Sequence, residues 1–427
     1  MKYDLIVVGG GPGGLMAAKT AAEDGLKVIL VERKRNITEI HRTCSQVFYV
    51  RKFSGNKAGL HGDGYIEPVS VEVDFETSRF NFPGPGFSLD YNGPLKPYLN
   101  WIEMSPSGYR IYSRKNTVWG FVLDKEAFLA ELLASVQKAG VEVWLETIGM
   151  QAENTRDGVK VLVRGKLGDQ TLEARAAIAA DGRESNIVES LGLNKKRQVL
   201  GSGKMVGYEL EGVETSLPPF SWLGVTMPSI TRRPTIKTIM MGELANDKKT
   251  MYAASEEDTQ KFMKHPNFSH WFRHARVVKK TGYGATTRTP IKEPVEENVV
   301  VVGDAAAPVE TWIQGAVAMA YMAVKAIEKE LSGQTGYPEY IDWWQKAFYF
   351  HNPDYWNYVF ECFALANAWS SDEEVDFIYN LLQDKEGMPP AVIAQNLDLF
   401  KPGRPELYQK LKNAFDEVQK RVSKLGS

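Results

Sequence analysis

The stretch that decides the fold lies at the start of the chain, where residues 5–18 read LIVVGGGPGGLMAA and residues 28–32 read VILVE. The first four residues are an apolar run, as expected of a strand buried on both faces of a parallel sheet. A glycine-rich turn and a helix follow, and the second apolar run ends at an acidic residue. This order of strand, turn, helix and strand predicts a Rossmann-type βαβ unit.

The glycines of this stretch have the spacing G-x-G-x-x-G, at Gly9, Gly11 and Gly14. Gly9 allows a sharp turn, Gly11 lets a pyrophosphate approach the backbone, and Gly14 lets the helix pack closely on the strand. The start of the helix offers free N–H groups to phosphates. Glu32 can accept hydrogen bonds from ribose hydroxyls and disfavours the 2′-phosphate of NADP. The alternative is an ordinary tight turn of an α/β protein.

Two later segments belong to the same pattern. Residues 177–185 read AIAADGRES, and residues 299–308 read VVVVGDAAAP. In the last segment a β-branched strand ends at Gly303 and Asp304, and ligands bind at such strand ends in open α/β sheets. Asp304 is also suited to capping a helix, and the two roles are compatible.

Together the three segments resemble the FAD-binding motifs of the p-hydroxybenzoate-hydroxylase-like flavoproteins, in their usual order. Within that superfamily the chain is most similar to the geranylgeranyl reductase family. The segment EIHRTCSQ places Cys44 where that family has an Arg-Cys motif, with Arg42 displaced by one residue. The segment SSDEEVDFIYNLL, residues 370–382, resembles the family's carboxyl-terminal helix start.

The chain departs from the family after the Gly-Asp motif. The family usually has a Pro and a run of glycines there, whereas this chain has Thr311 and Trp312, and only Gly315 remains of the run. The departure leaves the contacts to the flavin ring open. It suggests a divergent member with a different substrate.

The resemblance implies FAD as the cofactor, with Asp304 binding the ribityl chain. A second G-x-G-x-x-G unit after a strand is missing, so either NAD(P)H acts transiently at the flavin or electrons come from reduced ferredoxin or another carrier. The predicted cofactor-binding residues are Gly9, Gly11, Pro12, Gly13, Gly14, Glu32, Arg33, Arg42, Thr43, Asp181, Gly182, Gly303, Asp304, Gly315 and Ala316.

Cys44 is the candidate catalytic residue. Reduction of a C=C bond by hydride needs a proton on the neighbouring carbon, and a thiol near the flavin could donate it or shape the pocket. The alternative is a buried, inert cysteine. His41, Arg42, Arg232 and Arg233 are candidates for binding an anionic group. Motifs for a metal, such as H-E-x-x-H or C-x-x-C, are missing from the sequence.

Three functions are compatible with these motifs. The first, which Cys44 and the Ser370 helix favour, is reduction of a C=C bond of an apolar or CoA-linked substrate. The second is aromatic-ring monooxygenation. The third is electron transfer to a quinone or partner protein, without substrate chemistry. A flavin-binding fold that has lost its activity is the non-enzymatic alternative.

Composition narrows the classes of partner. The chain has 427 residues, a net charge of −2 and a pI of about 6.4, which favours neither nucleic acid nor anionic membranes. The cysteines, Cys44 and Cys362, are far apart, and the first strand leaves no room for a targeting segment. We therefore expect free thiols and a cytoplasmic location.

Two segments bear on membrane contact. Residues 305–324 carry a single charge, Glu310, but Pro308 and Gln314 favour a helix buried beneath the cofactor over a membrane span. Residues 341–369 are rich in aromatic side chains. They suit core packing or a dimer interface best, but a substrate wall or a peripheral membrane contact is also compatible.

The predicted fold class is α/β (α+β). We expect a Rossmann-type FAD-binding domain made of residues 1–43, 119–198 and 284–336. Interleaved with it, residues 44–118 and 199–283 should form an antiparallel-sheet substrate domain. Within the first domain, residues 121–140 are expected to be an amphipathic helix and residues 141–150 a strand. Residues 337–427 should form a helical region.

Overall fold

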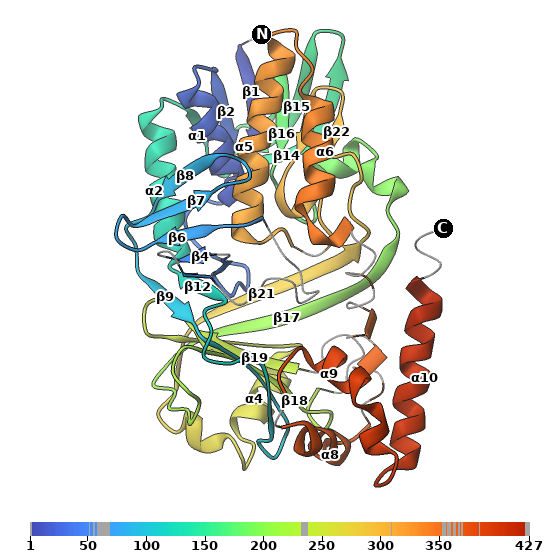
Figure 1. Ribbon diagram of the computed structural model, residues 1–427. Coiled ribbons are helices and arrows are strands. Elements are labelled where there is room, and N and C mark those ends of the chain that lie inside the picture. The colour runs from blue at the N-terminus through green and yellow to red at the C-terminus, as the bar shows by residue number, and fades with distance from the viewer. Residues whose placement is uncertain are drawn as a thin grey trace.

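The computed structural model describes residues 2–50, 52–53, 56–57, 69–231, 238–308, 310–351, 356, 360–361, 364–365, 368, 370–383 and 385–422. Figure 1 shows one large sheet with its helices in the upper half and a second large sheet crossing below it. Helices near the carboxyl terminus lie beside the second sheet. This arrangement confirms the predicted fold class.

The upper, eight-stranded sheet contains the strands that precede all three motifs. Its path is β13-β2-β1-β16-β15-β14, and β23 pairs with both β16 and β22. β1, β16 and β23 are parallel neighbours, because Val8 pairs with Ala179 and Ala179 pairs with Val301. The three motif strands therefore end at one edge of the sheet. The strands are β1 (Tyr3–Val8), β2 (Val28–Val31), β13 (Glu142–Trp144), β14 (Ile148–Thr155), β15 (Gly158–Gly165), β16 (Gly168–Ala179), β22 (Val295–Glu296) and β23 (Val299–Val301).

The lower, seven-stranded sheet has the order β11-β10-β18-β19-β20-β17-β21, and all its pairs are antiparallel except β10 with β18. Its long strands β17 and β21 cross the middle of the molecule, directly below the upper sheet (Figure 1). The strands are β10 (Asn100–Met104), β11 (Arg110–Arg114), β17 (Val199–Glu211), β18 (Ser221–Thr226), β19 (Thr238–Glu243), β20 (Lys249–Ala253) and β21 (Arg276–Arg288).

Two small sheets account for the remaining described strands. One has the order β3-β12-β9 and the other β5-β4-β6-β7-β8. Their strands are β3 (Val47–Tyr49), β4 (Lys52–Phe53), β5 (Asn56–Lys57), β6 (Glu72–Asp74), β7 (Arg79–Phe82), β8 (Phe87–Asp90), β9 (Leu95–Tyr98) and β12 (Gly120–Leu123).

The helices of the upper half pack on one another, with α1 against α2 and α5, and α5 against α6. The α-helices are α1 (Pro12–Glu23), α2 (Lys125–Lys138), α3 (Asn186–Ser190), α4 (Glu256–Met263), α5 (Trp312–Leu331), α6 (Tyr337–Ala347), α8 (Asp372–Leu382), α9 (Pro389–Gln395) and α10 (Pro405–Val422). Short 3₁₀ turns are η1 (Leu193–Lys196), η2 (Ser269–Phe272), η3 (Gly303–Ala305), η4 (Tyr349–His351) and η5 (Leu397–Phe400).

The core follows the hydrophobic pattern of these elements. Leu5, Ile6 and Val7 of β1 have no exposed surface, as expected of a central parallel strand. They belong to one cluster with the buried faces of α1 and α5. Separate clusters lie between the lower sheet and α4, and among the carboxyl-terminal helices.

Two predicted elements have different boundaries. The helix expected over residues 121–140 begins only at Lys125, since residues 121–123 pair with both neighbouring strands of a small sheet as β12. Asp124 then caps α2 by accepting hydrogen bonds from the N–H groups of Glu126 and Ala127. The strand expected over residues 141–150 is broken between β13 and β14, where Glu146 has a φ of +53°.

The apolar stretch expected to be a buried helix lies mostly in α5. In the part of the chain that the structure describes, no helix is long and apolar enough to cross a membrane. Among the described residues, α6, α8, α9 and α10 confirm the predicted helical region after residue 337. The division of the chain into domains stays a prediction.

Candidate functional site

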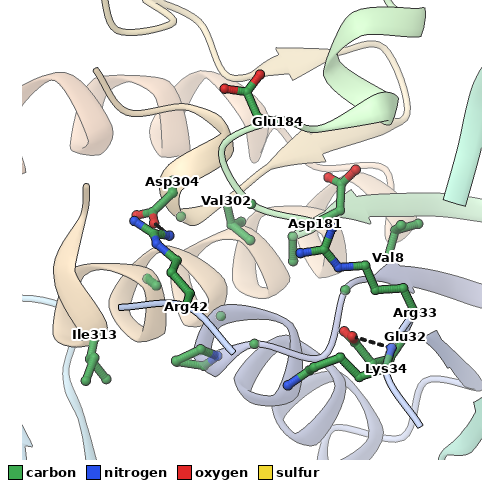
Figure 2. A pocket seen from close by; sticks show the side chains of 18 of the residues that line it. Val8, Glu32, Arg33, Lys34, Arg42, Asp181, Glu184, Val302, Asp304 and Ile313 are labelled. Carbon is green, nitrogen blue, oxygen red and sulfur yellow. Dashed lines mark hydrogen bonds and ion pairs between the residues drawn. The ribbon is translucent and has the colours of Figure 1, made fainter. Parts of the chain in front are cut away.

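A cavity lies along the edge where β1, β16 and β23 end (Figure 2). Most of the predicted site residues line it: Gly9, Gly11, Pro12, Gly13, Glu32, Arg33, Arg42, Thr43, Cys44, Asp181, Gly182, Gly303, Asp304 and Ala316. Gly14 and Gly315 are not in the lining. Residues as far apart in the sequence as Gly9 and Ala316 therefore meet at one site.

The glycines of the first turn differ in what surrounds them. Gly9 has a φ of +104°, and a Cβ there would lie 2.4 Å from the carbonyl oxygen of Ala180. A Cβ on Gly14 would lie 1.7 Å from the carbonyl oxygen of Gly9, so this glycine allows α1 to pack on the turn. A Cβ on Gly11 would meet nothing within 4 Å. The Gly11 backbone is thus open to the cavity, as close approach by a phosphate requires.

Glu32 directly follows β2 and lies at one end of the cavity (Figure 2). It is 5% exposed, and its carboxylate accepts hydrogen bonds from the N–H of Gly10 at 2.5 Å and of Lys34 at 2.8 Å. The carboxylate therefore ties the end of β2 to the glycine turn. Arg33 and Lys34 follow it in the cavity lining, and the Arg33 side chain extends toward Asp181 in Figure 2.

Asp181 and Gly182 form the middle of the lining, after β16. The hydroxyl of Ser185 donates to Asp181 Oδ1 at 2.6 Å, and its oxygen accepts from the N–H of Val188 to cap α3. Burial raises the pKa of Asp181, although the Ser185 hydroxyl opposes the rise. Asp181 thus holds the turn and faces the cavity at once.

Arg42, Asp304 and Glu310 form an ionic cluster at the other end of the cavity (Figure 2). The Arg42 guanidinium donates to Asp304 Oδ2 and to Glu310 Oε1, each at 2.6 Å. The N–H of Thr311 donates to Asp304 Oδ1 at 2.9 Å. Burial alone would raise the pKa of Asp304, but Arg42 and Arg183 hold it below its ordinary value. Asp304 is therefore an ionised acceptor at the end of β23.

Arg42 and Thr43 reach the cavity because residues 41–43 pair with β21. The N–H of Thr43 donates to the carbonyl of Gly282 at 3.1 Å, and the two threonine hydroxyls of Thr43 and Thr281 lie 3.0 Å apart. The Arg42 guanidinium lies 4.4 Å from the centre of the Tyr283 ring, a cation–π distance. A strand of the lower sheet thus fixes the segment that carries the predicted Arg-Cys motif.

Cys44 follows this segment and lines the cavity as a partly exposed, free thiol. Its sulfur accepts a hydrogen bond from the N–H of Gln46 at 3.4 Å, and the Lys125 ammonium lies 3.6 Å away. Cys44 is therefore reachable from the cavity and is held by polar groups, unlike an inert core cysteine.

Comparison with known proteins agrees with this geometry. A model of the FAD dependent oxidoreductase family matches residues 4–37. A digeranylgeranylglycerophospholipid reductase from Methanocaldococcus jannaschii is 26% identical, over 81% of this chain and 83% of its own length. A solved geranylgeranyl bacteriochlorophyll reductase-like structure from Thermoplasma acidophilum matches with a TM-score of 0.62 and 17% identity, over 96% of this chain and 99% of its own.

Over most of its length the chain is similar to proteins named as digeranylgeranylglycerophospholipid reductases. It is an FAD-dependent oxidoreductase, and its relatives favour reduction over monooxygenation. The fold alone would not decide between these chemistries. A flavin-dependent brominase matches this chain with a TM-score of 0.57 and 14% identity, over 98% of this chain and 99% of its own.

The cavity fits FAD by its own features. The open backbone at Gly11 suits a pyrophosphate, the buried carboxylate of Glu32 suits ribose hydroxyls, and the ionised Asp304 suits the hydroxyls of a ribityl chain. Lys34 and Lys125 also line the cavity, and their ammonium groups suit a ligand with phosphates.

Sequence reasoning missed several residues that line the cavity. Lys125 and Glu310 line the cavity, but the sequence shows only a helix start and a lone acid at these positions. Trp312 also lines it, and only its departure from the family's glycine run marked it. Tyr283, which contacts Arg42, was also missed, because these two residues are far apart in the chain.

Other predicted anion-binding residues are less informative. His41 is 63% exposed at its side chain and lies 3.1 Å from Glu39, on the surface. Arg232 and Arg233 lie outside the described residues. Gly315, predicted as a cofactor-binding residue, lies against the ring of Phe348, which a Cβ would approach to 2.8 Å. Its contact with the cofactor stays a prediction.

Proposed function

We propose that this protein binds FAD along the cavity and reduces a C=C bond of an apolar or CoA-linked substrate. The observation that carries the proposal is the meeting of three motif strands at one edge, with Cys44 in the lining of the same cavity. The relatives named as reductases support reduction as the chemistry.

The residues would hold FAD in distinct ways. The start of α1 at Gly11 would take the pyrophosphate, Glu32 would accept hydrogen bonds from the adenosine ribose, and Asp304 would bind the ribityl chain. Thr43 and Ala316 would also contact the cofactor, because both line the cavity. These assignments follow the motif positions and the cavity lining.

Bound FAD supplies the hydride for such a reduction. The protein must then orient the substrate and provide a proton to the second carbon of the double bond. Cys44 is the candidate donor, because its thiol lies in the cavity lining. After donation the thiolate would lie 3.6 Å from the Lys125 ammonium, which stabilises a negative sulfur.

Three further assignments belong to the same proposal. The FAD-binding domain would be residues 1–43, 119–198 and 284–336, which hold every strand of the upper sheet. The substrate domain would be residues 44–118 and 199–283, which hold most of the lower sheet. We also propose a cytoplasmic location, with NAD(P)H or a carrier such as reduced ferredoxin as the electron donor.

The test is an anaerobic titration of the purified protein with electron donors, monitored through the absorption spectrum of the flavin. We expect a bound-flavin spectrum that is bleached by NAD(P)H or by a reduced low-potential donor, and that returns when an alkene substrate is added. Rapid reoxidation in air with an aromatic substrate would instead support a monooxygenase. Purification without flavin would refute the cofactor assignment and with it the proposal.

A further inference from the structure

One end of the cavity is apolar and lies between two segments of the chain, the one that carries Cys44 and the one that begins at Glu310. Val47 lines this end from the first segment, and Trp312 and Ile313 line it from the second (Figure 2). Val47 is 3% exposed and Ile313 is 5% exposed, whereas Trp312 is half-buried. A substrate that reaches the Cys44 thiol therefore meets these apolar side chains.

Two contacts keep these segments face to face. The Arg42 guanidinium donates to Glu310 Oε1 at 2.6 Å. The rings of Tyr49 and Trp312 meet with 4.6 Å between their centres and an interplanar angle of 68°. Tyr49 is 7% exposed and packs in turn on Trp119, whose ring centre is 5.5 Å away. The Trp312 indole is therefore held in place by packed aromatic rings.

The backbone at Trp312 is strained. Its φ is +60°, a conformation that is rare for bulky residues and free for glycine. The turn is fixed on both sides, because the N–H of Thr311 donates to Asp304 Oδ1 at 2.9 Å and α5 begins at Trp312. Strain of this kind is common at residues that contact ligands. The fold thus keeps a bulky side chain where glycine would be unstrained and would leave the cavity wider.

We propose that Trp312 determines the length of the substrate, because its indole closes the apolar end of the cavity. The substrate then extends only a short way past its double bond. Trp312 borders the cavity, so removal of its side chain enlarges the cavity at this end. A long prenyl chain would need the space that the indole fills. This inference rests on the proposed function and specifies its substrate class as a short-chain alkene.

The length of chain that the cavity accepts can be measured through binding alone, without turnover. Each methylene group of a ligand that the protein buries strengthens binding about fourfold, whereas a methylene group that stays in water adds nothing. In a series of straight-chain alcohols, affinity should therefore rise until the chain meets the end wall and should then stop rising. We call this point the chain-length limit.

Calorimetry of the oxidised holoenzyme with the primary alcohols from butanol to decanol measures this limit. We expect the affinity of the wild type to stop rising within the series. In Trp312→Gly the rise should continue over several further alcohols, whereas Trp312→Phe keeps a ring and should stay near the wild-type limit. Trp343→Ala on α6, which does not line the cavity, should leave the limit unchanged.

Three results would overturn the inference. Affinity that rises as far as decanol in the wild type, or no binding of any alcohol, would show that the indole does not close an apolar end. The same limit in wild type and Trp312→Gly would place the end wall elsewhere. Equal weakening of every alcohol in Trp312→Gly would make the indole a platform under the ligand. Flavin absorbance per chain checks the fold of each variant, and Trp312→Asn, which also tolerates this φ, replaces a glycine variant that loses flavin.

Turnover separates this inference from the proposed function. The photoreduced holoenzyme, kept anaerobic, should be reoxidised faster by prenol, a short allylic alcohol, than by geranylgeraniol in the same detergent. Trp312→Gly should raise the rate with geranylgeraniol at least about tenfold. Equal rates with both alcohols in the wild type would refute the length assignment and leave the reductase intact. Reoxidation by neither, with the chain-length limit in place, would refute C=C reduction and leave Trp312 as the end wall.

Discussion

At the scale of single residues, glycines of one motif serve different physical purposes. Gly9 and Gly14 meet protein atoms closely, so a side chain at either would disturb the fold of the turn. Gly11 meets nothing within 4 Å, so a side chain there would disturb only what enters the cavity. Gly11 is therefore the position at which cofactor binding can be changed with least effect on the protein.

We expect Gly11→Val to lower flavin affinity by at least about tenfold while the protein still folds. The valine side chain would occupy the space that the pyrophosphate needs. Flavin absorbance per purified chain measures the effect, and circular dichroism checks the fold. Gly201→Val is the matched control, since Gly201 also has open space around it but does not line the cavity. A Gly11→Val protein that purifies fully yellow would contradict the assignment.

The proposed catalytic role of Cys44 can be tested separately from cofactor binding in a similar way. If its thiol protonates the substrate, Cys44→Ser should slow reoxidation of the reduced enzyme by substrate about a hundredfold. Reduction of the flavin by dithionite should not change, because it needs no proton from Cys44. Anaerobic stopped-flow absorbance measures both steps in one preparation. Equal slowing of the two steps, or of neither, would leave Cys44 with a packing role only.

At the scale of elements, the cap of α2 connects stability with the site. Asp124 accepts hydrogen bonds from the N–H groups of Glu126 and Ala127, and the next residue, Lys125, reaches into the cavity. We expect Asp124→Ala to cost about 1 kcal/mol of unfolding free energy. Urea unfolding measures it, with Lys138→Ala at the exposed end of the same helix as the control. An unchanged midpoint would show that the cap does not stabilise the helix.

The elements also show which parts of the site a sequence can reveal. The turn between β1 and α1 was predictable because its glycines and its helix start are neighbours in the chain. The position of Arg42 over Tyr283 was not, because it depends on the pairing of segments about 240 residues apart. The start of α2 was misplaced because Phe121–Leu123 are apolar in a way that suits either a helix or the strand they form.

At the scale of the whole molecule, the carboxyl-terminal helices are held on the lower sheet by polar contacts. The hydroxyls of Ser105 and Ser107 donate to the Asp376 carboxylate of α8, at 2.5 Å and 2.7 Å. The Ser229 hydroxyl donates to Asp372 at 2.6 Å. Glu103 of β10 belongs to the same junction, because its charge acts on the buried Tyr379 of α8. In the described part of the chain, no lysine, arginine or histidine forms an ion pair with this carboxyl group.

Glu103 should make this junction sensitive to pH. Burial raises its pKa to about 7, although the indole N–H of Trp101 donates to it at 2.9 Å and lowers the value. The folded state therefore prefers the protonated acid. Its contribution to stability is fully present below the unfolded pKa of about 4.5 and is lost as pH rises through 7.

We expect the free energy of unfolding to fall by up to about 3 kcal/mol between pH 4.5 and pH 8 because of this one group. Glu103→Gln keeps the shape and the acceptor for Trp101 but cannot ionise, so the variant should lose this part of the pH dependence and should exceed the wild type in stability at pH 8. Urea titrations at several pH values measure both curves, and Glu406→Gln on the exposed face of α10 is the control. If the free energies of unfolding of wild type and Glu103→Gln changed with pH in the same way, Glu103 would have to reach solvent. The junction would then open more readily than its hydrogen bonds suggest.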